Sequence, residues 1–421
     1  MPTRFRLIFR SLHYRNFRLF FGGQSISLIG TWIQLTATPW LVYHLTGSVF
    51  LLGLIGFVGQ IPILIISPFA GVMIDRWNRH RILIVTQTFS MIQALLMALL
   101  FFTGIIEIWH VVLLSIALGC INAFDAPARQ SFFVEMIEKK EDLGNAIALN
   151  SSMVNAARLI GPSVAGILIA FTNEGICFLI NGVSYLFVIA SLLSMKVIPR
   201  KINNTNTHIL QELKEGISYI FGFPPIKYII LSMGLASLMG MQFGVLMPVF
   251  AKEILHGSSH TFGFLMGSTG LGALVAALYL ASKKNILGLF KKIPLAAAVF
   301  GSGLIAFSFS RLSFLSFILM AIIGFSMMFQ MASSNTILQT ITDDDKRGRV
   351  MGFYAMAFMG LAPFGSLLAG GLAQMIGAPY ALLTGGACIV AGAAIFWRKL
   401  PALRKMIRKV YVRLGIILPE L

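Results

Sequence analysis

The sequence predicts an all-α integral membrane protein with twelve transmembrane helices in two six-helix halves and both termini in the cytoplasm. Three observations support this fold class: the hydrophobic content, the number of long apolar runs and the distribution of basic residues. Hydrophobic residues make up 57% of the 421 positions and charged residues only 11%, and the mean hydropathy is +0.84. Such a chain has too little polar surface to enclose a water-soluble domain.

A helix needs about 20 residues to cross a hydrocarbon core of roughly 30 Å. The chain contains twelve apolar runs of about that length, at residues 17–43, 49–74, 81–103, 108–134, 143–171, 175–195, 226–251, 261–282, 291–309, 313–341, 348–376 and 379–397. The first run is long, rich in Gln and Thr, and lacks a clear small-residue cleavage site. We therefore expect a retained helix there and not a signal peptide.

The basic residues predict the orientation, because Lys and Arg in short loops mark the cytoplasmic side. With these spans, thirty of the 33 Lys and Arg fall on one side, Lys252 and Arg311 fall on the other, and Arg158 lies inside a span. Both termini are thus predicted to be cytoplasmic. The net charge of +18 follows the membrane topology, so we expect no nucleic-acid binding.

Six spans, a polar stretch and six further spans indicate a duplicated unit. The stretches "ARLIGPSVAGILIA" (157–170) and "GLAPFGSLLAGGLA" (360–373) occupy corresponding places in the fifth and eleventh spans. We predict six-helix halves at 1–195 and 226–397. A cytoplasmic linker at 196–225 with an amphipathic helix joins them, and a basic cytoplasmic tail at 398–421 follows.

The loop "GVMIDRWNRHRIL" (71–83) gathers charge between the second and third spans. Its Asp75 is a carboxylate at the membrane edge, which could receive helix N-terminal amides of the eleventh span or pair with Arg129 or Arg349. Such contacts close a cytoplasmic gate in one state and break in the other. The alternative is that the basic residues only enforce topology; these are Arg76, Arg79 and Arg81.

Asp125 is the one carboxylate that the predicted spans place well inside the membrane. A buried carboxylate at such a position is a candidate proton site. Arg129 lies one helical turn away on the same face, so a gating or structural ion pair is the alternative. Pro127 between them removes a helix hydrogen bond and favours a bend.

Arg158 is predicted near the membrane midplane, roughly 22 Å from the inner end of its span at 1.5 Å per residue. An arginine at this depth should face the central cavity and bind an anionic group of the substrate, or form a structural pair. Asp125 lies about 8 Å away in depth by the same rise, which makes a direct pair strained.

Further polar side chains at membrane depth are candidates to line a substrate cavity, although each alone is more often an interhelical hydrogen bond. They are Gln34, Asn122, Asn155, Asn181, Gln242 and Gln330.

The whole chain resembles the major facilitator superfamily (MFS fold), most specifically where Gly71, Asp75, Arg76 and Arg79 match its GxxxDRxxR loop. The stretches "FDAPARQSFFVEMI", "NAIALNSSMVNAARLIGPSVAG" and "RGRVMGFYAMAFMGLAPFGSLLAG" are similar to the drug:proton antiporter branch with the enterobactin exporter and macrolide efflux pumps. This resemblance implies export by proton antiport, a gate role for Asp75, and close helix approach at Gly71. It also implies an antiporter motif that shapes a helix contact through Gly161, Pro162 and Gly166.

No GxxxxGK[ST], HExxH or GxSxG element occurs in the sequence, so we expect neither ATP use nor an enzyme. The expected function is proton-coupled export of an amphipathic or siderophore-like organic molecule by alternating access. We expect a monomer in the lipid of a bacterial inner membrane, with a small-molecule substrate, no metal or cofactor, and the proton gradient as driving force. Alternatives are multidrug or macrolide efflux, uptake or flipping of a lipid-like substrate, and a non-transporting sensor.

Overall fold

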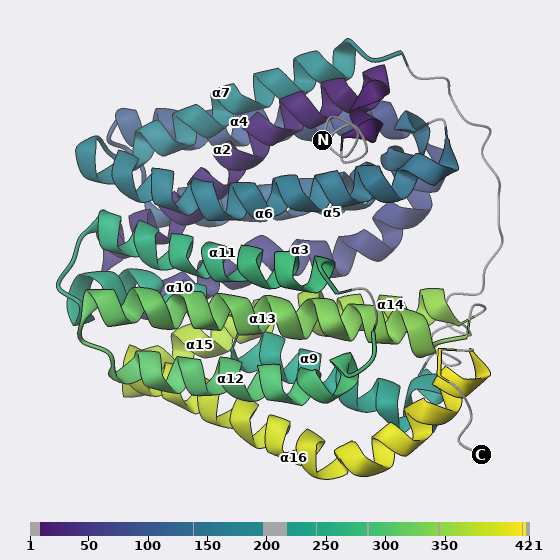
Figure 1. Ribbon diagram of the computed structural model, residues 1–421. Coiled ribbons are helices and arrows are strands. Elements are labelled where there is room, and N and C mark those ends of the chain that lie inside the picture. The colour runs from purple at the N-terminus through teal and green to yellow at the C-terminus, as the bar shows by residue number, and fades with distance from the viewer. Residues whose placement is uncertain are drawn as a thin grey trace, which may run out of the picture. The chain divides into compact units, whose positions relative to one another are not determined.

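The computed structural model describes residues 9–137, 139–196, 217–240, 242–283, 286–343, 346–414 and 416–417. The described residues form helices and turns and include no strand (Figure 1). Eleven helical stretches among them are long and apolar enough to cross a membrane. The 32-residue helix α2 (Arg15–Thr46), which carries many Gln, Ser and Thr side chains, is the remaining long helix. The all-helical membrane fold predicted from the sequence is therefore confirmed.

The chain divides into two compact units, of which unit 1 comprises Met1–Asn204 and Pro248–Gly270. Within it α2 packs against α6 and α7, and α4 packs against α5 and α7. Its core contains the fully buried rings of Phe17, Phe20 and Phe132. The elements that lie wholly in unit 1 are η1 (Arg10–His13), α2, α3 (Val49–Arg76), α4 (Arg79–Phe102), α5 (Ile108–Met136), α6 (Lys140–Phe171), α7 (Glu174–Leu193) and η2 (Phe250–Ile254).

Unit 2 comprises Thr205–Met247 and Leu271–Leu421. Within it α12 packs against α13 and α16, and α9 packs against α15 and α16. The helices α10 (Phe243–Val249) and α11 (Ser259–Ala281) contribute residues to both units. The elements that lie wholly in unit 2 are α9 (Pro224–Met239), α12 (Leu289–Phe309), α13 (Ser313–Ile341), α14 (Arg347–Ala355), η3 (Met356–Gly360), α15 (Ala362–Ile376) and α16 (Ala378–Arg413).

Short polar side chains cap the first turns of α3 and α4. The Oδ1 of Asn78 accepts a hydrogen bond from the backbone N–H of Arg81 at 3.2 Å and thereby caps α4. Ser48 caps α3 in the same way. Such caps satisfy amide groups that have no partner inside the helix. The charged loop between α3 and α4 is therefore a tight turn, and the side chains of Asp75 and Arg76 in it lie outside the described residues.

Two predicted spans are interrupted in the structure. The span at 226–251 is divided into α9, α10 and the π-helical η2, and the span at 348–376 is divided into α14, the π-helical η3 and α15. Pro248 lies just before η2 and Pro363 just after η3. Proline lacks a backbone N–H, and its ring crowds the carbonyl one turn earlier. A wider π-helical turn beside the proline relieves this crowding and the lost hydrogen bond.

The last helix continues past the predicted twelfth span, which ends at residue 397. In the structure α16 continues to Arg413. The additional turns carry an apolar stripe that packs into the core of unit 2, formed by Leu400, Leu403, Ile407 and Tyr411. This burial stabilises the helix beyond the apolar run. The linker helix predicted within 196–225 falls mostly outside the described residues; residues 217–222 of it are helical.

Candidate functional site

The carboxylate of Asp125 lies in a buried polar cluster between α4 and α5 of unit 1. Asp125 is only 2% exposed. Its Oδ1 accepts hydrogen bonds from the Thr86 hydroxyl at 2.9 Å and from the Gln87 amide at 2.7 Å. Its Oδ2 accepts from the Arg129 guanidinium at 2.5 Å. Thr86, Gln87 and Arg129 are thus all placed as donors to the two carboxylate oxygens.

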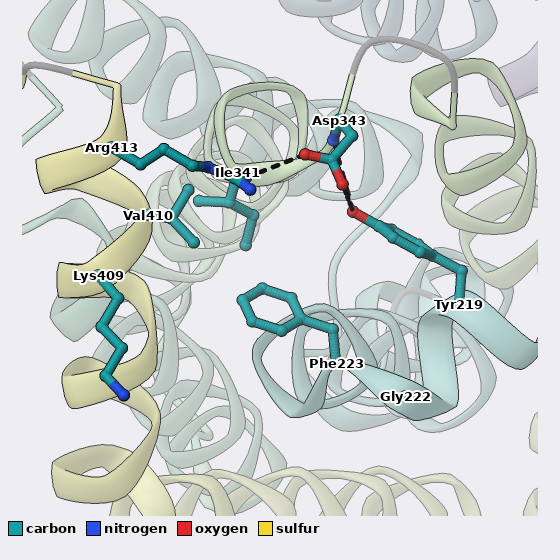
Figure 2. A pocket seen from close by; sticks show the side chains of 8 residues that line it. All are labelled: Tyr219, Gly222, Phe223, Ile341, Asp343, Lys409, Val410 and Arg413. Carbon is teal, nitrogen blue, oxygen red and sulfur yellow. Dashed lines mark hydrogen bonds and ion pairs between the residues drawn. The ribbon is translucent and has the colours of Figure 1, made fainter.

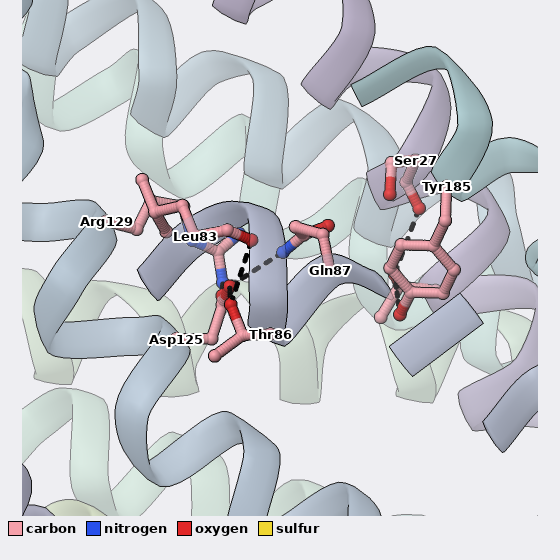
Figure 3. A network of polar contacts seen from close by, with 8 residues as sticks. Ser27, Leu83, Thr86, Gln87, Asp125, Arg129 and Tyr185 are labelled. Atoms are coloured by element: carbon pink, nitrogen blue, oxygen red, sulfur yellow. Dashed lines mark hydrogen bonds and ion pairs between the residues drawn. The ribbon is translucent and has the colours of Figure 1, made fainter. Parts of the chain in front are cut away.

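The Asp125 cluster contains an acceptor that is not used. The Oε1 of Gln87 is buried and has no hydrogen-bond partner among the described residues. In Figure 3 this oxygen points away from Asp125. A buried amide oxygen without a partner is costly, so this acceptor is open to a hydrogen-bond donor.

Arg158 on α6 lies against an aromatic ring of α2 and not against a carboxylate. Its guanidinium carbon is 5.1 Å from the centre of the Trp32 ring, within the range of a cation–π contact. Its Nε is buried without a hydrogen-bond partner in the part of the chain that the structure describes. The strained pair with Asp125 is not formed, because Asp125 is occupied by Arg129.

The sequence motif beside Arg158 explains why Trp32 lies so close. A Cβ added at Gly161 would collide with the Cβ of Trp32. Gly161 is three residues after Arg158, on the same face of the helix. The missing side chain therefore lets the α2 backbone approach α6 and places the indole against the guanidinium.

The remainder of the predicted antiporter motif packs against the first half of α11. A Cβ at Gly166 would lie 2.8 Å from the Cα of Gly263, and a Cβ at Gly263 would lie 2.7 Å from the carbonyl oxygen of Pro162. Farther along the same contact, a Cβ at Gly270 would lie 2.8 Å from the Cα of Leu159. The two backbones thus touch along Gly263 and Gly270, within unit 1.

Two of the predicted cavity residues are held in interhelical hydrogen bonds. The Asn181 amide donates to Gln34 Oε1 at 2.7 Å, and the Gln34 amide donates to Gln93 Oε1 at 2.9 Å. All three side chains are buried. This chain joins α7, α2 and α4, and it is the packing alternative that the sequence left open for these residues.

The other predicted polar residues lie in different surroundings. Asn122 is half-buried on α5, and the Asn155 amide donates to the Ser151 carbonyl of its own helix at 2.9 Å. In unit 2, Gln242 Oε1 accepts from the Ser366 hydroxyl at 2.6 Å, and the Gln330 amide donates to Ser232 at 3.1 Å. The substrate role of these residues stays a prediction.

The predicted gate residues are only partly described. Arg79 forms an ion pair with Glu135 at 3.0 Å, which ties the start of α4 to α5. Arg349 is half-buried on α14 of unit 2. A Cβ at Gly71 would meet no heavy atom within 4 Å, so the close helix approach implied for Gly71 is not seen here. The gate itself stays a prediction.

A second polar cluster lies where α2 ends, and it was not predicted from the sequence. The Tyr43 hydroxyl donates to Glu253 of η2, and Lys252 lies over the Tyr43 ring at 5.7 Å. His44 Nδ1 contacts Glu174 Oε1 at 2.9 Å. Trp40, Tyr43, His44 and Lys252 line a cavity of about 180 Å³. The partners are more than 100 residues apart, so local sequence does not bring them together.

Comparisons with known proteins give the family. A family model described as transmembrane secretion effector matches residues 8–409. The staphyloferrin A transporter of Staphylococcus aureus is 25% identical over 361 residues, which cover 86% of this chain and 90% of that protein. Macrolide efflux protein A of Streptococcus pyogenes is 21% identical over 91% of this chain and 96% of that protein.

A solved structure of a D-xylose–proton symporter is 16% identical and superposes with a TM-score of 0.66 over 92% of this chain and 96% of that one. This likeness shows the shared fold. The chain therefore belongs to the transmembrane secretion effector family of the major facilitator superfamily of membrane transporters.

Proposed function

We propose that the protein is a proton-coupled exporter that moves an amphipathic or siderophore-like organic molecule outward across a bacterial inner membrane. Its two six-helix halves, 1–195 and 226–397, alternate access to a central site, and both termini are cytoplasmic. It works as a monomer and needs no metal or cofactor. The excess of basic residues on one side supports the orientation. A relative named staphyloferrin A transporter supports the substrate class, and relatives named as efflux proteins support the direction.

The observation that carries the proposal is the guanidinium of Arg158. Arg158 is half-buried, its Nε–H is a buried donor without a partner, and it has no carboxylate partner among the described residues; this fits an anionic group brought by a ligand. The Trp32 ring beside it supplies an apolar surface for the rest of an amphipathic molecule. Arg158 is thus the proposed substrate contact.

Proton coupling is assigned to Asp125. A proton that reaches the carboxylate neutralises it and removes the counter-charge of Arg129. The ion pair between them then no longer holds its present geometry, so the helices that carry it can rearrange. Loss of the proton to the other side restores the pair. The two roles that the sequence left open, proton site and gating ion pair, become two steps of one cycle.

The test uses purified protein in proteoliposomes with an imposed pH gradient, with anionic siderophores as substrates. We expect substrate-dependent proton movement, and we expect Arg158→Gln to weaken substrate affinity roughly tenfold to hundredfold, because a hydrogen bond to a charged group contributes about 1.5–3 kcal/mol. Arg158→Lys, which keeps the charge but loses the planar fork, should be intermediate. Unchanged siderophore affinity in Arg158→Gln would exclude this contact.

Macrolide or multidrug efflux is the second candidate, and the likeness to macrolide efflux protein A favours it. The same assay separates the two functions. Proton-coupled flux of cationic drugs that does not depend on Arg158 would make the arginine a packing residue and the protein a drug pump.

A further inference from the structure

The last helix is longer than a membrane span requires. α16 has 36 residues, which corresponds to about 54 Å at 1.5 Å per residue, against a hydrocarbon core of about 30 Å. Residues 398–413 therefore extend past the hydrocarbon into the interfacial layer. We call this segment the tail helix. In Figure 1 α16 bends along its length, and Pro401 at the start of the tail helix provides a cause.

The tail helix has two faces of opposite character. One face is the buried apolar stripe already described, which packs on unit 2. The other face is exposed and strongly basic, and residues 398–413 include no Asp or Glu. The exposed basic residues are Arg398, Lys399, Arg404, Lys405, Arg408, Lys409 and Arg413. Because the apolar face is occupied by the protein itself, only the charged face is presented outward.

A polar network holds the end of the tail helix in place. Arg413 forms an ion pair with Asp343 at 2.9 Å, and the Tyr219 hydroxyl donates to the other oxygen of Asp343 at 3.0 Å. Burial raises the pKa of Tyr219 above its ordinary value, which favours the neutral, donating hydroxyl further. Lys346 lies over the Tyr219 ring at 4.8 Å. The tail helix is thus tied to the end of α13 and to the segment before α9.

This network lines a cavity of about 470 Å³. Its polar groups come from Tyr219, Asp343, Arg413 and Lys409, and Phe223, Ile341 and Val410 form its apolar wall. Figure 2 shows Arg413 reaching toward Asp343, while Lys409, one turn earlier, points away from that ion pair. Arg413 is therefore engaged, whereas the ammonium of Lys409 is available to a ligand. The Asp343 carboxylate in the lining is paired with Arg413, so a phosphate carried on an apolar stem would find the ammonium of Lys409 and the apolar wall.

We propose that the basic face of the tail helix is a binding site for anionic phospholipid, with the phosphate of one lipid beside Lys409 at this cavity. The helix position at the membrane surface, its single sign of charge and the apolar wall all match a lipid and not a free phosphate. Each basic side chain close to an anionic leaflet strengthens attraction about fivefold. This site goes beyond the proposed transport function and depends on neither its substrate nor its direction.

The experiment measures lipid binding to the full-length protein without any transport assay, so its failure is distinct from failure of the exporter proposal. Purified protein in mixed micelles receives equal amounts of phosphatidylglycerol and phosphatidylcholine, and native mass spectrometry counts the lipids retained. We expect the wild-type protein to prefer phosphatidylglycerol. That preference should fall at least about tenfold when three charges of the tail helix are removed together, in a variant with Arg404→Gln, Lys405→Gln and Lys409→Gln.

A matched control removes three charges from another basic region of unit 2, with Lys283→Gln, Lys291→Gln and Lys292→Gln. We expect this variant to keep most of the preference for phosphatidylglycerol, because none of these lysines lines the cavity. Equal loss in both variants, or no preference in the wild type, would overturn the proposal, as would displacement of the lipid by millimolar inorganic phosphate. If the tail variant does not fold, lipid retention by the wild-type protein is measured at increasing salt concentration instead. We expect retention to weaken, because salt screens a charged site, and unchanged retention would overturn the proposal.

Discussion

The close contact between α6 and α11 gives a quantitative prediction for Gly166→Ala. An added Cβ would lie 2.7 Å from the carbonyl oxygen of Ser259 and 2.8 Å from the Cα of Gly263, against 3.4–4 Å for ordinary contact. Both obstacles are backbone atoms that cannot rotate away. The two helices must therefore separate by roughly 0.6–1.2 Å, and overpacking of this kind costs about 1–3 kcal/mol.

Helix propensity acts in the opposite direction, since alanine favours a helix over glycine by at most about 1 kcal/mol. The control is Gly144→Ala in the same helix, because a Cβ at Gly144 would meet no heavy atom within 4 Å. We expect thermal unfolding of the purified protein in detergent to occur at lower temperature in Gly166→Ala, and at the same or higher temperature in Gly144→Ala. A Gly166→Ala protein as stable as the wild type would refute the close-contact reasoning.

Three further substitutions test the buried polar groups. Asp125→Asn keeps the shape of the side chain but cannot carry the proton. We therefore expect pH-driven transport to fall at least tenfold, while substrate exchange without a gradient continues. Full pH-driven transport in this variant would contradict the coupling role. Gln34→Leu leaves the Asn181 amide without its buried acceptor, so we expect a destabilisation of about 1–3 kcal/mol, measured by thermal unfolding, and an unchanged midpoint would argue against the amide chain. Tyr43→Phe removes the hydrogen bond to Glu253, so amide hydrogen exchange at residues 250–254 should become faster, and equal exchange would show that this bond does not hold η2.

Features that depend on local sequence were predictable. The long apolar runs set the helical class and the approximate spans, because every backbone group must be satisfied inside lipid. The Asp125–Arg129 contact follows from i, i+4 spacing on one helix. The small residues of "GPSVAG" also predicted close helix packing. Which helices contact them could not be predicted from the sequence.

Features that join distant segments needed the tertiary structure. Trp32 and Arg158 are partners only because α2 and α6 pack at Gly161. The chain of Gln34, Gln93 and Asn181 requires three helices at once.

The tail helix shows the same division between local and tertiary causes. Its charges are plain in the sequence, but its apolar stripe keeps it helical to Arg413 only because unit 2 offers a surface to cover it. Hydropathy and periodicity record how each residue meets its neighbours along one helix. The free energy of packing depends on which helix faces contact each other. In a membrane, side-chain shape and buried hydrogen bonds between helices determine these contacts.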